Sequence, residues 1–386
     1  AQGSVTGFAH TGHGLVVPSN DLPNLLIPPF NDNGANEFLI DVTHGLVDFL
    51  SAVDTPAPAE LNLWYHALNC GFQVPMAGET DFPCLFEKVG VGRSYVYLAH
   101  PPVGDAGYKE WIAGLKGGRS YVSDGRSHIL SLEVDDRKLS EENHQVKLSA
   151  PGTVKVKVLI TAYLTEDLTA GAQAVRGKTL DETPFWHLER CRIGTSRQVS
   201  AELIVNGRSV ASRKIDATGE PQPIQFEANI QDSSWIAVRI LPSCHSNPIY
   251  VSVKGKPVRA SRESAQWCVD CIRAAWKRLG PRIAQQDQAE AIAAKDYAEA
   301  MFHRILRQLL LHCGQQTRRE GFLLCEIGIC ILRSRRMSTF RTSEKTDIHL
   351  QNAIDVRGMQ ASQSLVHSGP RPMVLITVLV LSLIHI

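Results

Sequence analysis

The sequence predicts an α/β region, then an antiparallel β-sandwich, then C-terminal helices. Three observations predict this order. Strand and helix patterns alternate over the first 125 residues, strict apolar/charged alternation marks the middle of the chain, and helical periodicity returns near Ser261. Of the 386 residues, 44% are hydrophobic and 20% are charged. This balance excludes collagenous, disordered and membrane-embedded proteins.

The overall charge gives no reason to expect a nucleic-acid partner. Forty basic and 39 acidic side chains leave a formal net charge of +1. The nine cysteines are scattered and odd in number, so they do not predict a disulfide framework or a compartment. The chain opens at Ala1 without Met or a signal-like segment. We therefore expect its native N-terminus to be missing, and a periplasmic or secreted location stays open.

Residues 1–126 form the expected α/β region. Val5–Ala9 is typical of a short buried strand that delivers His10 at its carboxyl end. Further strands are predicted at Phe38–Val42 and Leu46–Leu50, and helices at Pro58–Cys70, with Thr55 as its cap, and at Tyr108–Lys116. Alternating strands and helices favour a parallel sheet or part of a barrel.

Residues 127–258 form the expected β-sandwich. Lysines and valines alternate at the start of Thr153–Leu164, as in a half-buried strand. Asn206-Gly207 between two apolar runs indicates a tight hairpin. Strands are also predicted at Ile224–Phe226, Trp235–Leu241 and Ile249–Val253.

Residues 259–311 form the expected helical segment, with helices at Ser261–Leu279 and Asp287–Leu311. From residue 312 to 386 no period is sustained, and we expect a disordered tail that is foreign to the fold, such as an out-of-frame extension. Its final apolar run, Met373–Ile386, is shorter than the roughly 20 residues of a spanning helix. No membrane partner is therefore expected.

The first 87 residues contain no Lys or Arg. They contain ten carboxylates: Asp21, Asp32, Glu37, Asp41, Asp48, Asp54, Glu60, Glu79, Asp81 and Glu87. The same stretch holds His10, His13, His44 and His66. Carboxylates and imidazoles without fixed positive charge favour a cation site. An acidic solvated surface is the alternative, although several of these acids lie within apolar runs, where an unpaired charge is costly.

Two motifs carry the predicted metal site. His10 stands at a strand end among small residues, which suits a metal ligand. Glu79 and Asp81 lie two apart after another predicted strand, where both can face a divalent cation or divide into ligand and general base. A structural histidine and a capping aspartate are the alternatives. Together the motifs predict a metal site of His10, Glu79 and Asp81.

Weaker motifs are set aside. The glycines of Gly171–Thr179 are too far apart for a phosphate-binding loop, and Cys268–Cys271 lacks the second pair of a zinc site. The sequence has no Gly-x-Ser-x-Gly elbow of a serine hydrolase. The segment Arg119–His128 mixes cations and hydroxyls and could bind an anionic or polar substrate group; the alternative is a strand-and-turn seam.

Several segments in order resemble the CehA/McbA family of metallohydrolases, in the PHP (polymerase and histidinol phosphatase) superfamily. They are Leu63–Phe72, Gly78–Asp81, Gly118–Gly125, Ser243–Ile249 and Ala260–Cys268. The resemblance covers about residues 1–310.

The resemblance implies a partial, distorted PHP-like β/α barrel that uses divalent metals, zinc or manganese, against ester-type bonds. Characterised relatives include carbamate-ester hydrolases. By this resemblance His10 matches the single histidine of the third metal motif, and Asp81 matches the aspartate of the fourth, Asp-x-His. Pro83 stands where that histidine would be, and the first motif, His-x-His, would precede Ala1. Glu79 is the candidate to compensate as a ligand.

The sequence therefore predicts a hydrolase of carbamate, carboxylic or phosphoric esters that acts on a small molecule through metal-activated water. His13 or His44 is expected to pass a proton to the leaving group, and Arg119 or Arg126 to orient the substrate. The alternative is an inactive scaffold with a degenerate metal site, which the Pro83 substitution favours.

Overall fold

The computed structural model describes residues 5–81 and 90–332, with side chains described as far as residue 310. It is a mixed α/β fold with several sheets and C-terminal helices. The site and packing below belong to the compact unit that contains Ala1–His312. The first sheet has three parallel strands in the order β1-β2-β3: Gly7–Phe8, Phe49–Ala52 and Met76–Gly78. The sequence predicted a parallel layer or part of a barrel; the described strands form a parallel layer and do not show a barrel.

The predicted strand at Phe38–Val42 is wrong. Helix α1, Phe38–Asp41, and a 3-10 turn, Val42–His44, occupy this segment. Phe38, Leu39 and Val42 are the buried positions, and this spacing of one and four residues is helical rather than alternating. The strand predicted from Leu46 begins only at Phe49, and Leu46 itself is 63% exposed.

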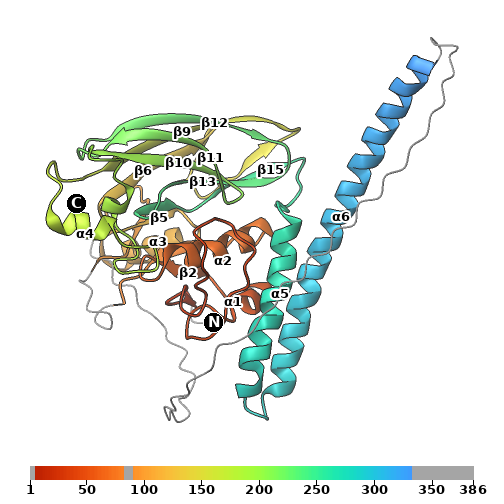
Figure 1. Cartoon of the computed structure of the whole chain (residues 1–386), viewed down its shortest axis with the longest axis horizontal. Coiled ribbons are helices and arrows are strands. Elements are labelled where there is room, and N and C mark those ends of the chain that lie inside the picture. The colour runs from red at the N-terminus through yellow and green to blue at the C-terminus, as the bar shows by residue number, and fades with distance from the viewer. Residues whose placement is uncertain (1–4, 82–89, 333–386) are drawn as a thin grey trace, which may run out of the picture. The chain divides into compact units, whose positions relative to one another are not determined.

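Two larger sheets make up the middle of the molecule. The eight-stranded sheet contains β4 (Arg93–Val96), β5 (Ser120–Ser123), β8 (Val146–Leu148), β10 (Gln198–Val205), β11 (Arg208–Asp216), β13 (Ser234–Ile240), β14 (Cys244–Ser246) and β15 (Ile249–Val253). The four-stranded sheet contains β6 (Ser127–Val134), β7 (Arg137–Lys138), β9 (Gly152–Ala162) and β12 (Gln222–Ile230). Figure 1 shows the two sheets stacked. Their buried side chains form one core, an arrangement consistent with the predicted sandwich.

The sandwich strands follow the sequence pattern closely. The first half of β9 alternates buried valines with exposed lysines from Val154 to Val158, as predicted. The hairpin of β10 and β11 turns at Asn206 and Gly207, which have φ values of 51° and 86°. Positive φ at both positions is the geometry of a type I′ turn. The sandwich begins earlier in the chain than the predicted residue 127. Strands β4 and β5 precede this residue, yet they pair within the eight-stranded sheet.

Helix α2, Ala57–Asn69, is buried at every residue, polar ones included. It contacts β2 on one side and β13 on another, and α5 (Arg262–Leu279) also packs against it (Figure 1). The predicted ends are within one residue, but Thr55 does not cap the helix. Pro56 is the N-cap residue, and the Thr55 hydroxyl donates to Glu60 instead.

Each polar side chain of α2 has a buried partner. The Asn62 Oδ1 atom accepts from the Asn24 amide at 2.7 Å, and Asn69 Oδ1 accepts from the Trp235 indole at 2.8 Å. His66 lies between the Asn24 carbonyl, 2.7 Å from Nε2, and the Ser264 hydroxyl, 2.9 Å from Nδ1. These bonds offset the cost of removing polar groups from water.

The remaining helices are α3 (Gly104–Lys116), α4 (Ala170–Arg176) and α6 (Gln288–Leu332), with 3-10 turns at Leu188–Cys191 and Gly280–Arg282. α5 begins after Ser261, whose hydroxyl accepts from the Ser264 amide at 3.0 Å. α6 continues to Leu332, beyond the predicted end at Leu311. The rest of the predicted tail, 333–386, lies outside the described residues. Among the helices that the structure describes, none has both the length and the apolar character needed to cross a membrane.

Candidate metal centre

The chemically distinctive residues gather where the three parallel strands end. His10 follows β1, Asp54 follows β2, and Glu79 and Asp81 follow β3. Because parallel strands all end at the same edge of their sheet, these four side chains meet at its carboxyl edge. This edge is where binding sites of parallel sheets are usually found.

His10 is the centre of the cluster. Its Nδ1 atom lies 3.0 Å from Asp54 Oδ2 and 3.3 Å from Glu79 Oε1. Its Nε2 atom lies 3.6 Å from Asp81 Oδ1, and its backbone amide donates to Glu79 Oε2 at 2.9 Å. One ligand atom from each of His10, Glu79 and Asp81 can be chosen so that all lie within 4.8 Å of one another. The predicted ligand set is therefore brought together.

The backbone around the cluster adopts unusual conformations. His10, Val53 and Asp81 have φ values of 49°, 87° and 53°. Such left-handed conformations cost energy for residues with a side chain, most of all for a β-branched one such as Val53. Strained positions of this kind gather at functional sites, where the surrounding structure holds them in place.

A close backbone contact fixes the strand that carries Glu79. Gly92 lies against the Glu79 carbonyl, and Gly78 lies against the backbone of Arg93. A Cβ atom at either glycine would overlap these backbone atoms. The glycines thus let the chain around Arg93 pack directly on the end of β3.

The cluster carries an excess of negative charge. The hydrogen bond to Asp54, supported by the Glu79 and Asp81 carboxylates and opposed by burial, raises the pKa of His10 to about 9. Burial, followed by the charge of Asp54, raises the pKa of Glu79, and the same two causes raise the pKa of Glu60. In the absence of a cation, this cluster therefore retains protons. A divalent cation would relieve the same repulsion.

The donor set fits a divalent metal. The Asp54 side chain is fully buried, and its Oδ1 atom has no hydrogen-bond partner among the described residues. One imidazole and several carboxylates are ligand types that divalent metal ions accept in proteins. His10, Glu79 and Asp81 could hold the ion, while Asp54 holds Nδ1 and leaves Nε2 toward Asp81. A carboxylate behind a metal-binding histidine is a common arrangement.

Asp54 and Glu60 were missed as site residues by the sequence analysis, although both were counted among the ten carboxylates. The strand before Asp54 was predicted to end at Leu50, whereas β2 ends at Ala52. With the correct strand end, Asp54 stands two residues beyond it, as His10 does beyond β1. This shared position, two residues after a strand end, is the signal that could have identified Asp54.

The two predicted proton carriers are placed differently. The ring of His13 stacks on that of His10, with centroids 5.5 Å apart, so His13 lies beside the cluster. His44 Nε2 lies 3.2 Å from the carbonyl of Ala294, and its ring packs on Tyr297 of α6. His44 also precedes β2, whose far end carries Asp54. The structure does not bring His44 to the cluster.

The two predicted substrate-binding arginines lie at opposite ends of β5. Arg119 precedes β5, and its neighbour Gly118 lies by Pro75, before the start of β3. Its Nη1 atom is 3.6 Å from Glu142 Oε1. Arg119 therefore lies near the amino end of β3, whereas the cluster lies beyond its carboxyl end.

Arg126 follows β5 and is exposed. The preceding Gly125 lies against the guanidinium of Arg93, and the backbone of Arg93 touches the end of β3. Arg126 thus lies toward the carboxyl end of β3, the end that carries the cluster. Arg93 is a further cation at this end that the sequence analysis did not single out.

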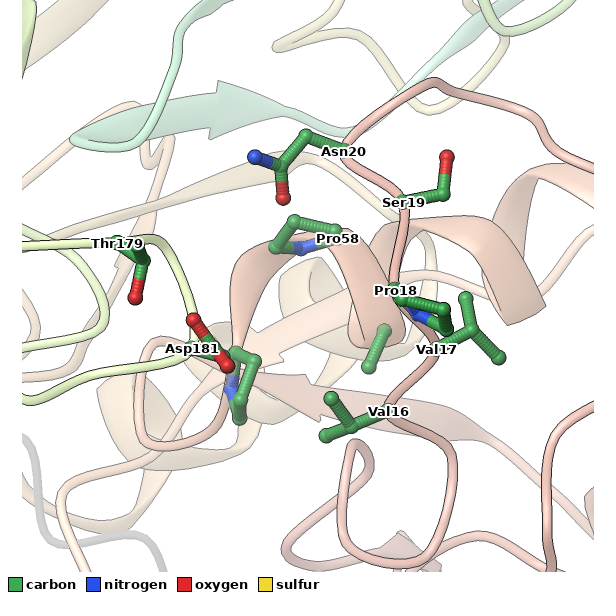
Figure 2. Close-up of a pocket in the computed structure, with 10 residues that line it drawn as sticks. Val16, Val17, Pro18, Ser19, Asn20, Pro58, Thr179 and Asp181 are labelled. Atoms are coloured by element: carbon green, nitrogen blue, oxygen red, sulfur yellow. The ribbon is translucent and has the colours of Figure 1, made fainter. Parts of the chain in front are cut away.

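The loops that carry His10 and Asp54 also line a pocket of about 220 Å3. Its walls are Val16–Asn20, then Pro56, Pro58 and Ala59 at the start of α2, and Thr179 and Asp181. Figure 2 shows Asp181 on one side of the pocket and Val16 and Val17 on the other. Among the described residues of this lining, Asp181 is the one charged residue, and none is a cation.

No protein-family model matches the chain, and a search of curated proteins gives no significant match.

Proposed function

We propose that this protein is a metal-dependent hydrolase of ester-type bonds. The observation that carries the proposal is the convergence of His10, Glu79 and Asp81, with Asp54 behind His10, at the carboxyl edge of a parallel sheet. These residues come from three separate strand ends. Their meeting concentrates buried negative charge, which a bound cation would offset.

A divalent ion in this cluster would supply Lewis-acid activation of water and of the substrate's carbonyl or phosphoryl oxygen. His10, Glu79 and Asp81 would hold the ion. Asp54 keeps the imidazole of His10 in one orientation by accepting from Nδ1. His13, which stacks on His10, is the group that can carry a proton to the leaving group.

The substrate is proposed to be a small molecule. Arg126 would orient it from the carboxyl end of β3, while the pocket between Val16 and Asp181 would receive its uncharged part. Zinc and manganese are the proposed metals. The CehA/McbA resemblance and a partial PHP-like barrel belong to the proposal too, supported by the ordered motifs and the parallel layer. The balanced charge gives no support for a nucleic-acid substrate.

The alternative is a scaffold protein with a degenerate metal site. One histidine in a cluster otherwise made of carboxylates favours it, as does Pro83 in the sequence where the related motif has histidine. A site of this composition holds transition metals less tightly than one with several imidazoles.

Metal analysis and hydrolysis separate the two functions. The purified full chain would be analysed for zinc and manganese, then assayed on p-nitrophenyl acetate, a p-nitrophenyl carbamate and p-nitrophenyl phosphate. We expect stoichiometric metal and hydrolysis of at least one ester, both lost on chelation and in a His10→Ala/Asp81→Ala variant. Metal without hydrolysis would support the scaffold, and absence of binding even in added zinc or manganese would overturn the metal site.

A further inference from the structure

The loops that carry His10 and Asp54 are joined through one buried carboxylate, Glu60. Its Oε1 atom accepts from the Thr55 amide at 2.9 Å and from the Thr55 hydroxyl at 2.6 Å. Its Oε2 atom accepts from the Val53 amide at 3.3 Å. Glu60 therefore binds the residues on both sides of Asp54, including Val53 with its left-handed backbone.

The same carboxylate reaches the loop of His10. The amide of Gly12 donates to the Thr55 hydroxyl at 2.9 Å, and that hydroxyl in turn donates to Glu60. Gly12 has no room for a side chain, because a Cβ atom there would press on Thr55 and Ala59. The loops of His10 and Asp54 are thus held together by Thr55 and Glu60.

The fourth donor to Glu60 comes from outside the parallel layer. The indole Nε1 of Trp186 donates to Glu60 Oε2 at 2.7 Å, and Trp186 is 1% exposed. Its segment is anchored on the eight-stranded sheet. The next amide, of His187, donates to the Pro242 carbonyl at 2.7 Å, and the amide of Leu188 donates to Asp124 Oδ2 at 2.8 Å.

We propose that Glu60 and Trp186 are positioning residues of the metal centre, through which the sandwich holds the loops of His10 and Asp54 in their binding arrangement. This inference deepens the proposed function and relies on it for the identity of the site. Neither side chain needs to touch the metal. Outer residues that orient metal ligands commonly change metal affinity by about 10- to 100-fold.

Trp186→Phe is the sharpest test, because it removes the indole N–H and retains an aromatic side chain. Trp235→Phe is the matched control. Trp235 lies in β13 of the eight-stranded sheet and, like Trp186, donates its indole N–H to α2, in its case to Asn69 Oδ1, 2.8 Å away. It has no hydrogen bond to Glu60, Thr55 or either loop.

The first measurement is amide hydrogen exchange in the full chain without added metal. We expect exchange in peptides spanning residues 10–14 and 51–56 to rise about tenfold in Trp186→Phe, relative to strand β9, and to stay unchanged in Trp235→Phe. The second is zinc and manganese titration, in which we expect affinity to fall about tenfold in Trp186→Phe only. Unchanged exchange in Trp186→Phe, or an equal rise in both variants, would overturn the inference.

A second variant keeps the test independent of one substitution. In Glu60→Gln an amide N–H₂ group meets at least one N–H donor that faces Glu60 in the native protein, so both loops should exchange faster. Because Glu60 and Trp186 share one hydrogen bond, the double variant Glu60→Gln/Trp186→Phe should be less perturbed than the sum of the single variants. Additive effects would contradict the link. If the native chain binds no metal, the proposed function fails, while hydrogen exchange still decides on Glu60 and Trp186.

Discussion

The Oδ2 atom of Asp54 lies 3.0 Å from Nδ1 of His10, and the other oxygen of this fully buried carboxylate has no partner among the described residues. This hydrogen bond fixes which ring nitrogen of His10 faces Asp54. Because Nδ1 is engaged, Nε2 is the nitrogen available beside Asp81. Asp54 therefore sets the direction in which His10 can bind an ion.

The double variant His10→Ala/Asp81→Ala is expected to lose the metal. It removes the one imidazole and one of two carboxylates of the ligand set, so zinc and manganese content should fall from stoichiometric to near background. Elemental analysis after gel filtration measures this. The exposed His100, changed to Ala, is the control that should retain the ion. Equal metal in the double variant and in the native chain would place the ion elsewhere.

Asp54→Asn is expected to weaken metal binding. The variant keeps the size of the side chain but loses the carboxylate behind His10, so the affinity for zinc should fall by about 10- to 100-fold. Thermal unfolding measures this as a smaller rise in melting temperature on adding zinc than in the native protein. An equal rise in both proteins would argue against a role of Asp54 in metal binding.

Gly92→Ala is expected to destabilise the fold and weaken the metal site together. A methyl group at this position would overlap the Glu79 carbonyl and displace the end of β3. Overpacking of this kind typically costs about 1–3 kcal/mol in the free energy of unfolding. Gly152→Ala at the start of β9 is a suitable control, because a Cβ atom there is 4.0 Å from its nearest neighbour. Urea unfolding and metal titration of both variants give the comparison.

Two buried histidines should make the protein less stable in acid. Burial lowers the pKa of His66 to about 4 and that of His245 to about 3, from an ordinary value of 6.5. Below pH 6.5 the unfolded chain binds protons at these imidazoles that the folded protein does not, so stability falls as the pH is lowered. The loss approaches about 1.4 kcal/mol per pH unit for each imidazole.

His245→Gln isolates one of these contributions. Urea unfolding between pH 7 and pH 4 should show a shallower loss of stability in this variant than in the native protein. His100→Gln, at an exposed position, should keep the native pH slope. Parallel curves for native protein and His245→Gln would show that His245 takes up a proton without unfolding.

Much of the fold follows from local sequence patterns. The alternation in β9 and the Asn206-Gly207 turn define strands whose faces differ strongly in burial, and such elements are predictable from the chain alone. Phe38–Val42 was assigned wrongly because a short apolar run fits a strand or a helical turn equally well. The place of β4 and β5 in the large sheet depends on long-range pairing that no local pattern encodes.

The candidate site was predictable to the extent that its residues stand at strand ends. His10, Glu79 and Asp81 were found in this way, whereas Asp54 was hidden by an error of two residues in the strand before it. Glu60 was missed for another reason. Its role depends on Trp186, more than a hundred residues away, and the spacing of one helix carries no trace of that contact.

Helix α2 is enclosed on every side, and its polar groups are paired with the N-terminal loops, the sandwich and α5. Detaching any of these neighbours would leave hydrogen-bonding groups stranded in an apolar interior. The parallel layer and the sandwich are therefore not independent folding units. Calorimetry should record a single cooperative melting transition for them, and an excised parallel layer should fail to fold.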